Sequence, residues 1–116
     1  MANPVWDGLV TYLTFVTTST NSFNIAKGTG AVTFIIPDLT TDTTVTVEGL
    51  DPINKTTWAA VNAYDPVSAA NTPVVLDEST YQVVPASALG CGTFRLTAPT
   101  TSQAGLKCTV IIDRIV

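Results

Sequence analysis

Apolar and polar residues alternate with a period of two along much of this chain. The alternation is clearest in TVTVE (44–48) and TFRLT (93–97), where each apolar residue is flanked by Thr, Glu or Arg. This pattern is typical of β-strands with one buried face, and no stretch of a dozen residues has the apolar spacing of a helix. We predict strands near residues 9–18, 23–27, 31–36, 43–49, 57–63, 73–77, 80–84, 92–98 and 105–115.

Turn-forming stretches such as KGTG (27–30) separate these strands, and SALG (87–90) could form a single helical turn. Short strands at this spacing are typical of two packed antiparallel sheets. We therefore expect an all-β chain, with one β-sandwich over residues 9–116 that is either jelly-roll-like or Ig-like. Residues 1–8 lack the pattern, and we expect an extended N-terminal arm there. Trp6 would either cover one end of the sandwich or reach a neighbouring subunit.

The segment VTVEGLDPINKTTWAAVNA (45–63) has the pattern of a hairpin. If strand 43–49 pairs with 57–63, opposite residues sum to about 106, and Glu48 lies opposite Trp58 on the face away from the core. Arg95 also points away from the apolar face of its own strand. We expect a cluster in which the Arg95 guanidinium pairs with Glu48 and stacks on Trp58. In the alternative interpretation, Trp58 is a core residue and Glu48 a solvated charge.

The chain has two cysteines, Cys91 and Cys108. If the strands 91–98 and 105–116 form a hairpin around the loop between them, the register separates the two cysteines by about 15 Å. A disulfide requires Cα atoms within about 7 Å. We therefore expect two free thiols, as in a reducing compartment.

Charged residues make up 12% of the chain, about half the usual ~25%, and 21 residues are Thr. A surface with so little charge suggests that partners or identical subunits cover much of it. The net charge is −4 and the five basic residues are scattered, so nucleic-acid binding is not expected. No apolar run is long enough for a membrane span, and the N-terminus lacks the features of a secretory signal.

The residues of the chain form no recognisable catalytic set. The chain has no histidine, which excludes His-based acid–base chemistry and most zinc sites. Asp38 and Asp42 lie in one loop and could hold Ca²⁺ weakly, but nothing near them resembles a dedicated ligand series, and solvation and Asx turns explain them better. We expect neither an enzyme nor a bound cofactor or metal.

The chain resembles the small β-sandwich domains of tailed-bacteriophage virion proteins, which include capsid decoration (cement) proteins and related tail modules. The similarity covers residues 30–115, with DPINK in place of the more usual Asp-Gly turn. The matching residues are Glu48-Gly49, Asp51, Thr57-Trp58, Val61, Tyr81, Phe94-Arg95-Leu96, Gly105 and Val110.

This resemblance implies a structural virion protein, made in the host cytoplasm, that decorates the outer capsid surface and stabilises the shell. Its partners would be the major capsid protein and copies of itself, with a trimer as one form of self-assembly. The interaction residues that we single out are Trp6, Glu48, Trp58 and Arg95. The alternatives are a tail, adaptor or fibre-associated virion protein, or a carbohydrate- or receptor-binding module. The last would need exposed aromatic residues, and we expect most of Trp6, Trp58, Tyr12, Tyr64 and Tyr81 to be buried.

Overall fold

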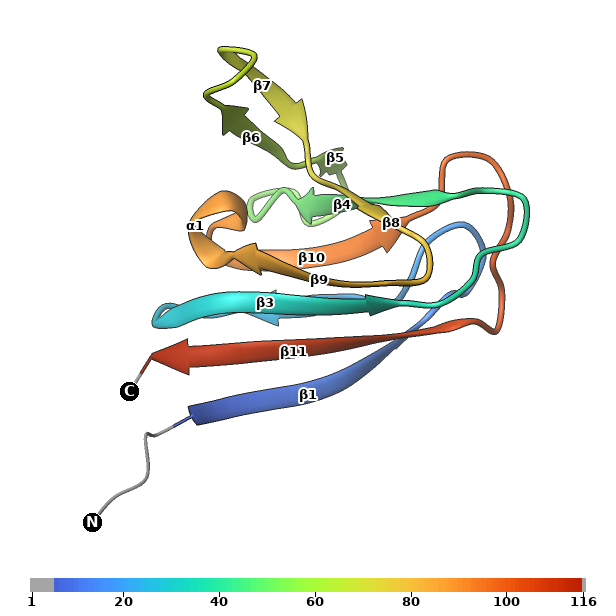
Figure 1. Cartoon of the computed structure of the whole chain (residues 1–116), viewed down its shortest axis with the longest axis horizontal. Coiled ribbons are helices and arrows are strands. Elements are labelled where there is room, and N and C mark those ends of the chain that lie inside the picture. The colour runs from blue at the N-terminus through green and yellow to red at the C-terminus, as the bar shows by residue number, and fades with distance from the viewer. Residues whose placement is uncertain (1–5, 116) are drawn as a thin grey trace.

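Two antiparallel sheets pack face to face, so the chain is the expected all-β sandwich (Figure 1). The computed structural model describes the backbone of residues 6–115 and the side chains of residues 9–63 and 65–113. The four-stranded sheet has the order β1-β11-β3-β9, with bounds Trp6–Thr14, Lys107–Ile115, Thr29–Ile36 and Thr80–Pro85. The five-stranded sheet has the order β2-β10-β4-β5, with bounds Phe23–Ile25, Gly92–Thr97, Thr44–Leu50 and Trp58–Ala60, and β8 (Val75–Asp77) also pairs with β4.

The order of the strands is that of a jelly roll rather than an Ig domain. The chain crosses from one sheet to the other between β1 and β2, β2 and β3, β3 and β4, and again between β9, β10 and β11. The first strand therefore pairs with the last, along the whole register from Trp6↔Ile115 to Thr14↔Lys107. Such crossings place strands that are neighbours in the sequence in opposite layers.

Strands β5 and β8 are two halves of one edge position. Each pairs with a different half of β4, through Leu50↔Trp58 and Val45↔Leu76 respectively. The chain between them leaves the sandwich as a separate hairpin, made of β6 (Asn62–Asp65) and β7 (Ala70–Pro73). Figure 1 shows this hairpin projecting away from both sheets.

Inward-facing residues of both sheets form one core, because the period-two pattern places every second side chain on the inner face. Phe34 of the four-stranded sheet contacts Phe23 of the five-stranded sheet edge-on, with ring centroids 5.8 Å apart, and Phe23 also lies 6.0 Å from Phe94. The remaining fully buried apolar residues include Leu13, Val32, Val45, Val47, Leu96 and Val110.

All of the predicted strand regions contain a strand, but two of them differ from the prediction in detail. Region 57–63 divides into β5 and β6, and region 9–18 ends at Thr14, after which the chain turns. Strand β7 (Ala70–Pro73) lies before the predicted region 73–77 and overlaps it only at its last residue. The predicted turn near 87–90 is the helical turn α1 (Ala86–Leu89).

The expected hairpin between strands 92–98 and 105–115 is wrong, because β10 and β11 belong to different sheets. The reasoning that separated the two cysteines was therefore wrong as well. Both are free thiols in the structure, with Cys91 exposed at the surface and Cys108 buried in the core of the other layer.

The expected N-terminal arm over residues 1–8 is also too long. Trp6, Asp7 and Gly8 are the first residues of β1 and pair with β11, because an edge strand can use backbone hydrogen bonds whatever its side-chain pattern. The rest of the expected arm lies outside the described residues.

Candidate functional site

Three of the four residues proposed for interaction meet on the outer face of the five-stranded sheet. Arg95 Nε donates a hydrogen bond of 2.8 Å to Glu48 Oε1 across the β10–β4 pair. The Arg95 guanidinium carbon lies 4.3 Å from the centre of the Trp58 ring. The predicted ion pair and cation–π contact are thus both present. Trp58 is half-buried at the sheet edge, so the alternative of a core position is wrong.

The predicted register of this hairpin was off by two residues. Glu48 pairs with Ala60 and Leu50 pairs with Trp58, so that opposite residues sum to 108 instead of 106. A shift of two keeps every side chain on its predicted face, because the side-chain period of a strand is two. Trp58 is therefore diagonal to Glu48 rather than opposite, and Arg95, which is paired directly with Glu48, reaches both.

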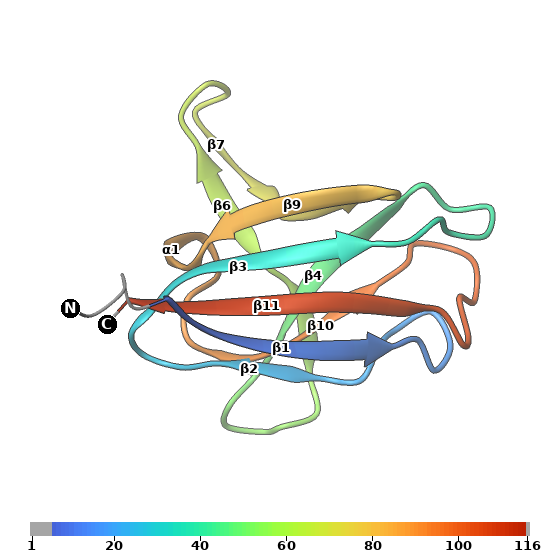
Figure 2. The ribbon, with the colours of Figure 1, turned by 60° about the horizontal axis from the view of Figure 1, so that its bottom comes forward.

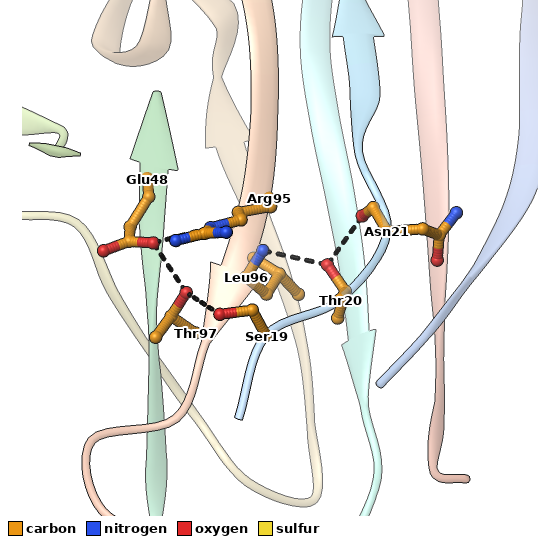
Figure 3. A network of polar contacts seen from close by, with 7 residues as sticks. All are labelled: Ser19, Thr20, Asn21, Glu48, Arg95, Leu96 and Thr97. Carbon is orange, nitrogen blue, oxygen red and sulfur yellow. Dashed lines mark hydrogen bonds and ion pairs between the residues drawn. The ribbon is translucent and has the colours of Figure 1, made fainter. Parts of the chain in front are cut away.

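Two hydroxyl groups extend the cluster across the sheet (Figure 3). Thr97 donates to Glu48 Oε1 at 2.7 Å, and its oxygen lies 3.0 Å from the Ser19 hydroxyl. Because the only hydroxyl proton of Thr97 is directed to Glu48, Ser19 is the donor in the second bond. Thr20, the residue after Ser19, also fixes this part of the chain to β10, because its hydroxyl accepts a hydrogen bond from the Leu96 N–H at 3.1 Å. We call Ser19, Glu48, Trp58, Arg95 and Thr97 the polar cluster.

Sequence reasoning missed Thr97 and Ser19. Thr97 lies two residues after Arg95 and therefore on the same face, so the alternation could have identified it. Ser19 has no such signal, because it lies in a turn whose position depends on the crossing from β1 to β2.

Trp6, the fourth proposed interaction residue, belongs to the other sheet. It begins β1, at the edge of that sheet, where its backbone pairs with Ile115. Its side chain lies outside the described residues.

The polar cluster has the chemistry of a recognition surface. Glu48 Oε1 accepts two hydrogen bonds, and Arg95 both pairs and stacks, so the charges are matched and held in place. The side chains of Arg95 and Glu48 keep 27% and 20% of their surface exposed, so a partner could contact them without rearranging the sheet.

The loop carboxylates that were considered for Ca²⁺ have structural partners instead. Asp42 is buried and accepts hydrogen bonds from the Thr100 hydroxyl at 2.5 Å and from the Thr101 N–H at 2.7 Å. These bonds, the Thr100 side chain first, lower the pKa of Asp42, although desolvation opposes the shift. Asp38 accepts from the Ser79 hydroxyl. Among the described side chains of residues 9–63 and 65–113, no group of three or more Cys, Asp or Glu residues is placed to hold a metal ion.

A surface hollow of about 400 Å³ lies near Cys91 and is bordered by Leu50, Pro52, Lys55, Gly92 and Thr93. Its lining contains a thiol and an ammonium group but no carboxylate, so it lacks an acid–base pair. In the part of the chain that the structure describes, no helix has the length and apolarity to cross a membrane.

Aromatic residues are more exposed than the sequence suggested. Tyr12 and Tyr81 expose 65% and 66% of their surface, whereas we expected most of the aromatic candidates to be buried. Both lie on the outer face of the four-stranded sheet, away from the polar cluster. The side chain of Tyr64 lies outside the described residues.

Comparison with known proteins gives a match of fold alone. No family model matches the chain, and no curated protein matches its sequence. Among solved structures, the chain is similar to the SPBc2 prophage-derived protein YomS, with a TM-score of 0.63 and 10% sequence identity. The similarity covers 97% of this chain and 98% of YomS, so the two share one complete β-sandwich fold.

Proposed function

We propose that this chain is a structural protein of a phage particle and, within that role, a capsid decoration protein. The observation that carries the proposal is the end-to-end similarity of fold to a prophage-derived protein. Viral capsid domains commonly use the jelly roll, and the resemblance noted in the sequence points to the same class. The proposed role requires no catalysis, cofactor, metal or nucleic acid.

A decoration protein must bind many identical sites on a shell and resist deformation there. The polar cluster suits such a contact because its side chains are already ordered in the free protein, which reduces the entropic cost of binding. Arg and Trp are also the residues most often found at the energetic centre of protein interfaces. We propose that this face contacts the major capsid protein, and that the protein stabilises the shell from its outer surface.

The number of copies in each particle tests the proposal. Quantitative mass spectrometry of purified particles should find this chain in a fixed ratio to the major capsid protein, because decoration follows the capsid lattice. A few copies per particle would instead indicate the tail, adaptor or fibre-associated role. Absence from purified particles would overturn a virion role altogether.

A binding assay tests the contact surface. Purified protein is added to shells that lack it, and the bound fraction is measured after sedimentation. Arg95→Gln and Trp58→Leu should reduce occupancy, while Lys27→Gln, which removes an exposed charge in the turn between β2 and β3, should leave it unchanged. Equal occupancy for all variants would exclude the polar cluster as the shell contact.

A further inference from the structure

The outer face of the four-stranded sheet is apolar, unlike the outer face of the five-stranded sheet. Two neighbouring rows of side chains cross all four of its strands, as the register of β1, β11, β3 and β9 shows. We call them the valine row and the tyrosine row. In strand order, they consist of Val10, Ile111, Thr33 and Val83, and of Tyr12, Thr109, Ile35 and Tyr81.

The two edge strands of this face are open to solvent, and its centre is less so. Val10 and Val83 expose 51% and 60% of their surface, comparable with the two tyrosines, whereas Ile35 exposes 37% and Thr33 only 3%. In Figure 2 the four strands lie side by side toward the viewer, and no other element of the described chain crosses in front of them. Exposed apolar side chains gathered on one face in this way are typical of a protein–protein contact.

The ends of the central strand β11 carry opposite charges on this same face. Lys107 and Asp113 share the side of the strand that bears Thr109 and Ile111, because all four are an even number of residues apart. Asp113 lies between Gly8 and Ala31 in the register. Its Oδ1 is buried, and no hydrogen-bond partner for it is found among the described residues.

This arrangement is self-complementary. Val110 lies midway between Lys107 and Asp113, and also midway between Thr109 and Ile111. Consider a second copy that is related to the first by a two-fold axis. The axis lies in the plane of the face, runs across the strands and crosses β11 at Val110. This rotation places Lys107 of each copy over Asp113 of the other. The same rotation places the valine row of one copy over the tyrosine row of the other.

The opposed rows also match in size. Along the four strands the rotation sets Val10 against Tyr12, Ile111 against Thr109, Thr33 against Ile35 and Val83 against Tyr81. Each contact thus combines a larger with a smaller side chain, which is how packed layers interdigitate.

The charged ends stay within reach of each other. Lys107 is three residues, about 10 Å, from the axis. The strands of two aligned, packed sheets cross at about 30°. At about 10 Å from the axis, this crossing moves Lys107 of one copy sideways from Asp113 of the other by about 5 Å. A lysine side chain spans such an offset across sheets that are about 10 Å apart.

The area reaches the size of a specific pair. The four strands have nine, nine, eight and six residues and together cover about 500 Å² for each copy before side-chain relief. The pair would bury about 1,000 Å², the size that a specific interface should reach. We propose that the outer face of the four-stranded sheet joins two copies of this chain across a two-fold axis at Val110.

The test uses purified protein in solution without particles, so its outcome is independent of the proposed function. Analytical ultracentrifugation should give a species of twice the 12.2 kDa chain mass. Lys107→Asp and Asp113→Lys should each raise the dissociation constant about tenfold or more, because each variant sets like charges against each other. Lys27→Asp makes the same charge change in a distant turn and should have no effect.

Mixing the two weakened variants gives the decisive result. The Lys107→Asp copy carries two acidic groups on the face and the Asp113→Lys copy carries two basic groups, so both contacts of the mixed pair are complementary. Native mass spectrometry should therefore detect a heterodimer that is tighter than either homodimer. Circular dichroism would verify that the variants stay folded. A wild-type monomer, a trimer as suggested by the resemblance, or a dimer that is insensitive to both variants would overturn the proposal.

Discussion

Gln103 and Thr40 exchange two hydrogen bonds across two loops of the sandwich. The Thr40 N–H donates to Gln103 Oε1 at 2.7 Å, and Gln103 Nε2 donates to the Thr40 carbonyl at 2.8 Å. The side-chain amide thus satisfies a backbone residue in the way that a paired strand would. Gln103 is only 1% exposed, whereas its partner Thr40 lies at the surface.

Replacing Gln103 by Leu should therefore lower the free energy of unfolding by about 2 kcal/mol, because it removes two hydrogen bonds that each contribute about 1 kcal/mol. Chemical denaturation monitored by fluorescence measures the change. The matched control is Ser102→Ala at the neighbouring exposed position, with an expected change within about 0.5 kcal/mol. Similar losses for both variants would show that the loop does not depend on the amide.

Asp42 should make the stability depend on pH in the acidic range. The pKa of Asp42 is lowered in the folded protein. Its contribution to the free energy of unfolding is therefore complete above the unfolded-state pKa of about 3.9, and it is lost as the pH falls through the folded-state pKa. Asp42→Asn should be less stable than the wild type at neutral pH, and the difference should shrink in acid. Thr100→Val removes the leading cause of the shift and should raise the pKa of Asp42 in an NMR titration. An unchanged titration would refute this assignment.

Arg95 and Trp58 should be energetically coupled. A double-mutant cycle with Arg95→Gln and Trp58→Leu should give a coupling free energy of about 0.5–1 kcal/mol, as expected for a partly exposed cation–π contact. The corresponding cycle for Arg95 and Glu48 should give about 0.2–1 kcal/mol and should weaken with added salt. A cycle between Arg95 and Lys107, which lie in different sheets, should give no coupling.

The two cysteines should differ in reactivity. Cys91 is exposed, whereas burial raises the pKa of the Cys108 thiol to about 12 and shields it from reagents. Alkylation of the native protein without reductant should add one group, at Cys91, and alkylation after denaturation should add two. Peptide mass spectrometry locates the modification. A protein that takes up no reagent in denaturant and weighs two hydrogen atoms less would contain a disulfide instead.

The positions and faces of the strands could be predicted from the sequence because both depend on local alternation. The Glu48–Arg95–Trp58 contact was predicted from the alternation that places these three side chains on one face. The register error of two residues did not change that face. The placement of β10 and β11 in different sheets could not be predicted in this way. The loop between those strands is short enough for a hairpin, and only the packing of the complete core places them in different layers.

The apolar outer face was not recognised either. In LVTYL (9–13), apolar residues occupy both sides of β1, with Val10 and Tyr12 outward and Leu13 inward. A strand with two apolar faces is normally a sign of burial on both sides. The pattern was therefore compatible with a fully covered strand, and the structure shows that the chain itself leaves one side open.

The hairpin of β6 and β7 has a consequence for engineering and for evolution. Its two ends are tied together where the Val74 N–H donates to the Val61 carbonyl at 2.9 Å, and Val61 in turn donates to the Val47 carbonyl at 2.9 Å. The sandwich therefore closes beneath the hairpin, whatever the length of the chain above that point. Val67 at the tip is 95% exposed. Foreign peptides inserted beside Val67 would be displayed at a distance from the jelly roll, and natural variants can lengthen, shorten or recode this tip while keeping the same scaffold.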